Sequence, residues 1–506
     1  MSDKTKYSEK MQKLLSLVEE LTDLSHISAV LGWDQQINLP PGGTEERALQ
    51  SAALGRIMHE KFATDEVGQL IADLEEEVGD LYAETDEARI VKVSKKTYEK
   101  QAKVPLPLLM EIIKTTTIAN EAWVKAKTQA DFSIFEPHLV KIVDLRKQYV
   151  ELFQPYDHVY DPLLDDFEPG MKTKDVKDIF DQLRPQQVQL LQEIAEKEPP
   201  DDSFIKQYYK EDHQEIFGRY VITRFGYDWN RGRLDVSPHP FTTEFGQGDV
   251  RITTRYLKED PGSSIFSTMH EAGHALYSQG VSEKYKRHPL GGAASLAIHE
   301  SQSRLWENII GRSMEFWTFF YPSLQMLFPG YLGNVSVDDF YRGINRVEPS
   351  FIRVEADEAT YNLHIMLRLE IELGLMEGTI AVKDLPEIWN SKMKEYLGVT
   401  PPDDAKGVLQ DVHWSGAMIG YFPTYALGNL ASVQLWDKLL EENPNVPDEI
   451  AKGKFETVLA WMREHIHQYG GKFEPQEIML KATGSKITPE PYIAYLRKKY
   501  SGIYEL

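Results

Sequence analysis

Ile265-Phe-Ser-Thr-Met-His-Glu-Ala-Gly-His-Ala-Leu-Tyr277 is the stretch from which the rest of this chain can be interpreted. Its apolar residues recur at helical spacing, and Asp260-Pro-Gly-Ser-Ser264 supplies capping residues just before it, so the sequence predicts a helix here. On a helix, His270 and His274 leave the same face about one turn apart and can hold a metal ion between them. Glu271 projects beside this pair, where a carboxylate can take a proton from water without being a ligand.

A histidine pair needs at least one further ligand, because catalytic zinc usually has three protein ligands and one open position. The chain contains no cysteine, which restricts the choice to histidine and carboxylate. Tyr277 and Gly280 stand where one common His-based motif requires glycine and histidine, so that arrangement is excluded. Ile298-His-Glu-Ser-Gln-Ser-Arg304 lies on a later predicted helix and offers both residue types. At this point either His299 or Glu300 could be the third ligand.

Two further segments carry residues suited to binding a peptide. Ser350-Phe-Ile-Arg-Val-Glu-Ala-Asp357 begins a predicted helix with Arg353 in an apolar setting, and a guanidinium there can bind a carboxylate through two hydrogen bonds. A pair with a neighbouring acid of the same segment is the alternative. His413, Tyr421 and Tyr425 follow in one Gly-containing stretch and can donate hydrogen bonds to a developing oxyanion, although aromatic core packing would also explain them.

The remaining pattern predicts a mainly α fold with one small sheet. Apolar residues recur every three or four positions through most of the first 200 residues, and long helices are expected at 293–316, 350–375 and 427–440. Between residues 234 and 256 the pattern alternates instead, which predicts a hairpin that could pair with an extended peptide or be purely structural. Because this hairpin ends shortly before the metal-binding helix, we expect the sheet to flank the site.

Composition limits the classes of function. The 506 residues carry a formal net charge of -23, which argues against binding to nucleic acid or to an anionic membrane. No apolar run reaches transmembrane length and the first residues lack the apolar core of a signal peptide, so a cytoplasmic location is expected. The Pro-rich segment 198–202 suggests a boundary between an N-terminal helical cap, residues 1–200, and a catalytic region, residues 201–506, that together form one unit.

Taken together, the motifs resemble those of the carboxypeptidase Taq family of zinc metallocarboxypeptidases, from residue 31 nearly to the C-terminus. Six motifs carry the resemblance, in this order: His239-Pro-Phe241, Asp249-Val-Arg-Ile-Thr253, His270-Glu-Ala-Gly-His274, His299-Glu-Ser-Gln302, Ile352-Arg-Val-Glu-Ala-Asp357 and Gly407-Val-Leu-Gln-Asp-Val-His-Trp414.

The resemblance implies a role for each site residue. It implies a mainly helical, cleft-containing body with a very small antiparallel sheet beside the metal, a homodimer, and Zn2+ that Co2+ or another divalent ion can replace. The implied zinc ligands are His270, His274 and Glu300, with Glu271 as general base and acid. The implied substrate-binding residues are Arg353 for the terminal carboxylate, His413 with Tyr421 or Tyr425 around the scissile carbonyl, and His239 and Arg251 without a definite role.

The resulting hypothesis is a cytoplasmic metallocarboxypeptidase that releases single residues from peptides with a free C-terminal carboxylate. Two alternatives stay open at this point. One is an oligoendopeptidase on the same helical scaffold, and the other is a peptide-binding protein with a non-catalytic metal site.

Overall fold

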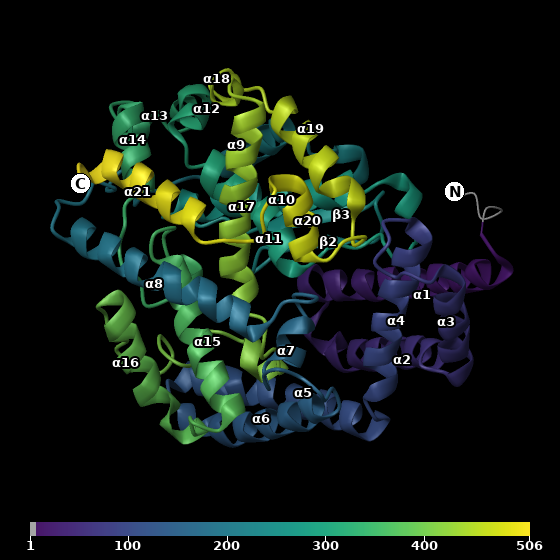
Figure 1. Cartoon of the computed structure of the whole chain (residues 1–506). Coiled ribbons are helices and arrows are strands. Elements are labelled where there is room, and N and C mark those ends of the chain that lie inside the picture. The colour runs from purple at the N-terminus through teal and green to yellow at the C-terminus, as the bar shows by residue number, and fades with distance from the viewer. Residues whose placement is uncertain (1–6) are drawn as a thin grey trace.

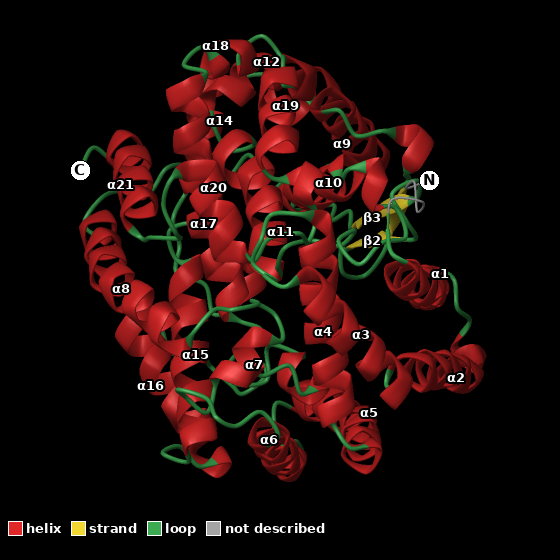
Figure 2. Ribbon diagram, turned by 45° about the vertical axis from the view of Figure 1, so that its right-hand side comes forward, coloured by secondary structure: helices red, strands yellow, loops and turns green. Residues whose placement is uncertain are grey.

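Helices make up most of the described chain, which is residues 7–506 of a computed structural model, and three short strands lie together at one side of the body (Figure 1, Figure 2). The predicted mainly α fold with one small sheet is confirmed. The α-helices are α1 (Glu9–Ile37), α2 (Thr44–Phe62), α3 (Asp65–Val78), α4 (Asp86–Lys103), α5 (Leu106–Gln129), α6 (Glu136–Glu151), α7 (Asp161–Asp165), α8 (Thr173–Ala195), α9 (Glu211–Phe225), α10 (Pro261–Gly280), α11 (Leu296–Arg304), α12 (Met314–Leu327), α13 (Pro329–Leu332), α14 (Val337–Ile344), α15 (Tyr361–Glu377), α16 (Leu385–Leu397), α17 (Pro423–Glu442), α18 (Val446–Ile450), α19 (Glu456–His465), α20 (Pro475–Thr483) and α21 (Glu490–Tyr504). Short 3-10 helices include η7 (Arg353–Glu355) and η9 (His413–Gly416), and η6 (Leu305–Ile310) is a π-helix.

The sheet consists of β1 (Leu234–Val236), β2 (Thr242–Glu244) and β3 (Val250–Thr254), with β3 in the centre. The hairpin predicted for residues 234–256 is confirmed for β2 and β3, which are antiparallel. It is wrong for β1, which lies on the other edge of β3 and runs parallel to it. The sheet packs against α10, and Figure 2 shows it beside that helix and near the end of α1.

Helix α10 carries His270, Glu271 and His274 and forms where the sequence predicts a helix. Asp260 caps it, because its side chain accepts a hydrogen bond from Ser263 N at 3.2 Å, and Pro261 occupies the first helical position. Most of its side chains are buried, among them Met269 and Leu276. The helix is therefore a central element of the core, although His270 and His274 keep part of their surface exposed.

Helix α11 lies between α10 and α17, and two glycines allow it to approach both (Figure 1). A Cβ atom on Gly273 of α10 would lie 2.6 Å from Ser303 Cα of α11. A Cβ atom on Gly428 of α17 would lie 2.7 Å from Glu300 Cβ. Since both distances are shorter than a real contact, only glycine permits this packing, and the packing determines where Glu300 lies.

Two of the long helices predicted from the sequence are shorter than expected. The helix expected at 293–316 begins at Leu296 after the cap residue Ser295, continues as the π-helix η6, and ends before Ser313, which caps α12. The helix expected at 350–375 begins only at Tyr361, because Asp357 accepts hydrogen bonds from the backbone of Ala359 and Thr360 and forms a turn. The helix expected at 427–440 is confirmed and is longer, as α17.

The N-terminal helices contact the C-terminal part of the chain through buried and half-buried ion pairs. Arg89 on α4 pairs with Glu477 on α20 at 2.8 Å, and Lys472 pairs with Asp86 at 2.7 Å. The division into a cap and a catalytic region near residue 200 stays a prediction. In residues 7–506, no helix combines the length and the apolar character needed to cross a membrane.

Candidate active site

Three side chains from two helices meet at one point. The Nε2 atoms of His270 and His274 on α10 are 3.2 Å apart. Glu300 reaches them from α11, with its Oε2 atom 3.6 Å and 3.5 Å from the two Nε2 atoms. One ligand atom from each residue lies within 4.8 Å of the other two. Two imidazole nitrogens and one carboxylate oxygen form a donor set that suits zinc and leaves a coordination position open, so these residues fit a divalent metal ion.

Two charged residues that follow Glu300 in the chain, Arg304 at the end of α11 and Glu307 in η6, support this cluster. Glu307 Oε2 lies 2.8 Å from His270 Nδ1, and Arg304 Nε donates to Glu300 Oε1 at 2.7 Å. Burial disfavours the ionised carboxyl groups, but Arg304 and His270 outweigh it and hold the pKa of Glu300 well below its usual range and that of Glu307 at about 2. Burial likewise disfavours imidazolium, yet Glu300 and Glu307 raise the pKa of His270 to about 9. The two carboxylates are therefore ionised, and Arg304 and the His270 imidazolium balance their charge.

His299 lies behind His274 and outside the cluster. The two residues contact each other through their Nδ1 atoms, and the His299 ring also packs on Tyr277 at 5.3 Å between centroids. Because His274 directs Nε2 to the cluster, its Nδ1–H is the donor in this contact and His299 is the acceptor. Burial and then the neighbouring His274 lower the pKa of His299 well below its usual value, so it is neutral and can accept.

Glu271 lies next to the cluster without belonging to it. Its side chain is largely buried, and its Oε2 atom accepts a hydrogen bond from Thr242 Oγ1 at 2.6 Å. The same hydroxyl lies 3.0 Å from the Glu271 backbone carbonyl oxygen. The edge strand β2 therefore orients this carboxylate, and the Oε1 atom of Glu271 has no hydrogen-bond partner among residues 7–506.

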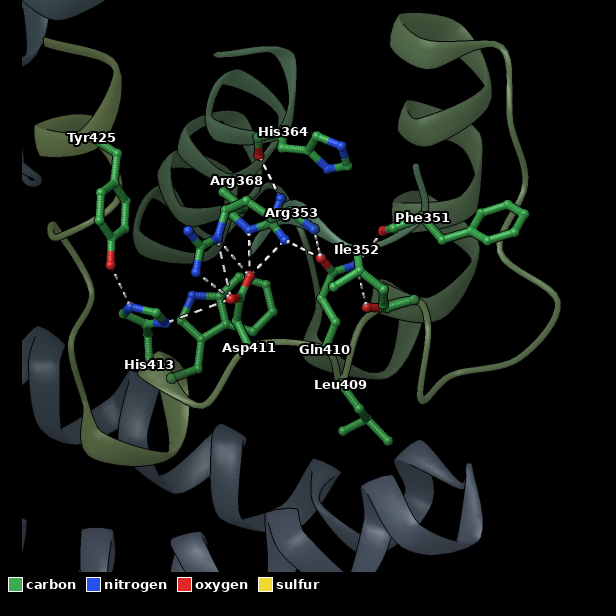
Figure 3. Close-up of polar contacts among 12 residues, drawn as sticks. Phe351, Ile352, Arg353, His364, Arg368, Leu409, Gln410, Asp411, His413 and Tyr425 are labelled. Atoms are coloured by element: carbon green, nitrogen blue, oxygen red, sulfur yellow. Dashed lines mark hydrogen bonds and ion pairs between the residues drawn. The ribbon is translucent and has the colours of Figure 1, made fainter. Parts of the chain in front are cut away.

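Arg353 belongs to a buried ionic group centred on Asp411 (Figure 3). Its Nη2 atom donates to Asp411 Oδ1 at 2.8 Å, while Arg368 Nη2 donates to Asp411 Oδ2 at 2.6 Å. Gln410 Oε1 accepts from both Arg353 N and Arg368 Nη2. Burial disfavours the Asp411 carboxylate, but the two guanidinium groups hold its pKa far below its usual range. Two arginines therefore share one aspartate, and the group carries a net positive charge.

Tyr361 connects this ionic group to the metal-ligand cluster. Its hydroxyl accepts from Arg353 Nη1 at 2.9 Å, and the guanidinium of Arg304 lies over its ring at 4.5 Å. Arg304 in turn donates to Glu300. The first residue of α15 therefore lies between the residue that supports Glu300 and the arginine predicted to bind the substrate carboxylate.

The three aromatic candidates of the 413–425 stretch lie together next to Arg353. His413 Nε2 is 3.4 Å from Tyr425 Oη, and the ring of Tyr421 lies 5.2 Å and 5.3 Å from those of His413 and Tyr425. The Arg353 guanidinium lies over the Tyr425 ring at 4.8 Å. Burial raises the pKa of Tyr425, so its hydroxyl is a neutral hydrogen-bond donor, and burial lowers the pKa of His413 to about 4.

Neither His239 nor Arg251 forms a hydrogen bond, an ion pair or a ring contact with these site residues in the described part of the chain. His239 is exposed, and its imidazole has no hydrogen-bond partner among residues 7–506. Arg251 forms two hydrogen bonds of 2.8 Å with Asp249 and packs over the rings of Trp33 and Phe245, at 4.7 Å from each. Its observed contacts therefore connect the sheet to α1.

Comparison with known proteins shows the family to which this chain belongs. The family model described as carboxypeptidase Taq (M32) metallopeptidase matches residues 13–500. The chain belongs to this family. It is accordingly a metallopeptidase of the carboxypeptidase type, and the family resemblance drawn from the six sequence motifs is confirmed.

Several relatives of the family are similar over nearly their whole length. Thermostable carboxypeptidase 1 of Thermus thermophilus is 40% identical over 503 residues, covering 97% of this chain and 98% of the relative. Carboxypeptidase 1 of Bacillus subtilis is 39% identical over 496 residues, covering 98% and 99%. The crystal structure of an M32 carboxypeptidase from Deinococcus radiodurans matches with a TM-score of 0.94 at 36% identity, covering 99% of this chain and 100% of that one.

Sequence reasoning missed several residues that shape this M32 site. Thr242, Arg304, Glu307, Tyr361 and Asp411 each hold a candidate site residue in place. Arg304 had a local signal, because it stands four residues after Glu300 on a helix. Thr242, Tyr361 and Asp411 had none, because their partners are between 8 and 58 residues away in the sequence.

Proposed function

We propose that this M32 metallopeptidase removes single residues from the C-terminus of peptides, using a zinc ion held by His270, His274 and Glu300. The observation that supports this most is the partly buried cluster of two imidazoles and one carboxylate, with Glu271 beside it. Mass spectrometry of a peptide digested with and without a chelator tests the proposal. We expect a ladder of products shortened one residue at a time, which disappears with the chelator, whereas internal cleavage would contradict it.

In the proposed reaction, Glu271 moves the proton. His270, His274 and Glu300 would hold a zinc ion, which would supply Lewis acidity to a water molecule and to the peptide carbonyl. The free oxygen of Glu271 takes a proton from the attacking water and then delivers it to the leaving amine. Thr242 keeps the other oxygen occupied, so that the carboxylate cannot turn away from the substrate. His413 and either Tyr421 or Tyr425 donate hydrogen bonds to the oxygen of the scissile carbonyl.

Arg353 is proposed to bind the substrate's terminal carboxylate. A guanidinium has five N–H groups, and contacts with Asp411 and Tyr361 use one on Nε, one on Nη2 and one on Nη1. One N–H on each terminal nitrogen remains, which is the pair that binds a carboxylate through two hydrogen bonds. Because a second cation, Arg368, shares Asp411, the group keeps a positive charge for the substrate.

Comparison of free-acid and C-terminally amidated peptides tests this role of Arg353. The parent enzyme should prefer the free acid, and Arg353→Ala should remove most of that preference, by about 10- to 100-fold in kcat/KM. Arg56→Ala, at an exposed helix pair with Glu60, is the matched control and should retain it. Equal cleavage of both peptides by the parent enzyme would refute the role.

The identity of the metal is a separate part of the proposal. We propose zinc, with cobalt or another divalent ion able to replace it, because two nitrogen donors and one oxygen donor suit these borderline ions. Elemental analysis of the purified protein should give about one zinc per chain. Activity should return when zinc or cobalt is added to the chelated protein, and recovery with magnesium alone would contradict the assignment.

We further propose that the chain forms a homodimer in the cytoplasm. The resemblance implies the dimer, and exposed apolar side chains on the N-terminal helices, among them Ile27, Leu49, Met110 and Ile113, offer surface that a second subunit could cover. The absence of cysteine means that the fold needs no oxidising compartment. Light scattering should give twice the chain mass of 58.1 kDa, and cell fractionation should recover the protein with cytoplasmic markers. A monomer at micromolar concentration would refute the dimer.

A further inference from the structure

Glu372, on α15, contacts both ends of the loop that carries His413 and Tyr421. Residues 413–421 are called here the 413–421 loop. Glu372 Oε1 accepts a hydrogen bond from Trp414 Nε1 at 2.8 Å, and Glu372 Oε2 accepts one from Gly420 N at 3.0 Å. Trp414 directly follows His413 in the chain, and Gly420 directly precedes Tyr421. One carboxylate therefore fixes the loop at both ends.

A third donor connects the same carboxylate to the N-terminal part of the chain. Tyr160, the residue before α7, donates its hydroxyl hydrogen to Glu372 Oε2 at 2.5 Å. Gly420 has a positive φ of 103°, and a Cβ atom there would lie 2.4 Å from the carbonyl oxygen of Leu163 on α7. The 413–421 loop is therefore packed between α15 and α7, and a side chain at position 420 would force it away.

No lysine or arginine bonds to the Glu372 carboxylate in residues 7–506, although the side chain is fully buried. All three donors are neutral, and burial raises the pKa of the Tyr160 hydroxyl well above its usual value. Arg368, one turn earlier on α15, is a charged residue that lowers the pKa of Glu372. Hydrogen bonds from neutral donors to a buried carboxylate are strong only when the carboxylate is ionised, so the three contacts depend on its charge.

We propose that Glu372 is a positioning residue whose ionised carboxylate holds the 413–421 loop so that His413 and Tyr421 reach the peptide carbonyl. The inference rests on the proposed function for the roles of those two residues. When Glu372 binds a proton, its O–H group can donate only to the Tyr160 hydroxyl, and the contacts with Trp414 and Gly420 weaken because a neutral carboxyl group is a poorer acceptor than a carboxylate. The loop is then held less firmly, and turnover falls.

The midpoint of this change lies near neutral pH. Burial raises the pKa of Glu372 to about 7, against the opposing effect of the Tyr160, Gly420 and Trp414 hydrogen bonds. The loop contacts are therefore about half formed near pH 7, strengthen as the pH rises above it and are lost as the pH falls below it. In the enzyme, kcat/KM for free-acid peptides should rise with pH through this range.

The Trp414 indole N–H reports directly on the Glu372 carboxylate and can be observed without any catalysis. In the zinc-loaded protein labelled with 15N-tryptophan, Trp414→Phe identifies its indole resonance. We expect this resonance to titrate between pH 6 and 8.5 in the parent protein and not to titrate in Glu372→Gln. Tyr160→Phe removes one donor to the carboxylate, so it should move the midpoint to higher pH. A resonance that is constant from pH 6 to 8.5 in the parent protein would overturn the proposal.

Kinetics provide the second readout. At pH 8, Glu372→Gln should lower kcat/KM for a free-acid peptide about tenfold and flatten its dependence on pH, with zinc content unchanged. Glu370→Gln is the matched control, because it lies on the same helix but pairs with Lys392 and Arg184 at the surface. It should leave both the Trp414 titration and kcat/KM within twofold of the parent values.

Failure of the proposed function and failure of the Glu372 role give different experimental results. A parent enzyme that does not shorten peptides from the C-terminus refutes the proposed function, while the Trp414 titration still measures the Glu372 contact. An active parent enzyme together with a fully active Glu372→Gln variant refutes the positioning role. If Glu372→Gln does not fold, the Tyr160→Phe midpoint decides, and an unshifted midpoint counts against the proposal.

Discussion

At the scale of single residues, the site depends on which neighbours on a helix face each other. His299 and Glu300 are adjacent in the sequence, so their side chains project about 100° apart around α11. Glu300 faces His270 and His274, whereas His299 lies behind His274. The sequence left this choice open because helical periodicity does not give the rotation of one helix relative to another.

Glu271 provides the most direct test at this scale. Glu271→Gln should retain the fold and zinc but lower kcat by about 10²- to 10⁴-fold, because the amide keeps the contact with Thr242 and cannot accept a proton. Steady-state kinetics with zinc analysis measure this. Glu259→Gln, at an exposed position just before the same helix, is the matched control. A Glu271→Gln variant with near-normal kcat would refute the assigned base.

Glu307 should affect zinc affinity more than protein stability. Glu307→Gln replaces the carboxylate that holds His270 Nδ1, so we expect zinc to dissociate about 10- to 100-fold more readily. Competition with a chromogenic chelator measures the dissociation constant without any peptide substrate. Glu259→Gln is the control and should bind zinc as the parent protein does. Unchanged zinc affinity in Glu307→Gln would show that the proposed supporting role of Glu307 is wrong.

At the scale of elements, the site depends on the close packing of α10, α11 and α17. Gly273 and Gly428 remove the side chains that would separate these helices, and the π-helical segment η6 continues α11 through Glu307. A π-helix changes the direction in which following residues project, which is one reason why such segments are frequent at functional sites. The position of Glu300 is therefore a property of three helices together.

Replacement of one of these glycines tests the packing. Gly273→Ala places a methyl group against Ser303, so α11 must move away from α10, and we expect the free energy of unfolding to fall by about 1 to 3 kcal/mol. Because the shift also moves Glu300, zinc affinity should fall as well. Gly55→Ala on α2 meets no atom within 4 Å and is the control. Chemical denaturation and chelator competition measure the two effects, and unchanged zinc affinity would contradict the packing argument.

At the scale of the whole molecule, ion pairs connect the N-terminal helices to the rest of the chain. Asp86 at the start of α4 accepts hydrogen bonds from Lys472, Lys284 and Tyr285. Burial disfavours the Asp86 carboxylate, but these hydrogen bonds outweigh it and lower its pKa from 3.8 to about 2. The folded protein therefore binds this proton less readily than the unfolded chain.

The Asp86 contact should stabilise the fold at neutral pH and fail in acid. Since the folded pKa is about 2 and the unfolded value is 3.8, the contribution is complete above about pH 4 and is lost as the pH falls toward 2. Asp86→Asn should lower the free energy of unfolding at pH 7 by about 1 kcal/mol, after allowance for solvent screening. Glu76→Gln, at an exposed position on α3, is the control. Equal stability of Asp86→Asn and the parent protein at pH 7 would contradict this.

The sequence by itself determined the mainly α fold, the helix of the two histidines, the β2–β3 hairpin and membership of the M32 family. These features are local or follow from short motifs: periodicity defines α10, Asp260 caps it, and alternation defines β3. The predicted helix end at residue 316 and the predicted helix start at residue 350 were wrong, because side-chain caps and turns end or delay a helix without changing its apolar spacing.

Only the tertiary structure decided how distant residues meet. It placed His299 behind His274, shared Asp411 between Arg353 and Arg368, and attached the 413–421 loop to Glu372. Each of these contacts joins residues that are between 25 and 58 positions apart in the chain. The physical reason is that a hydrogen bond depends on distance in space, and the packing of helices fixes that distance only when the whole core is formed.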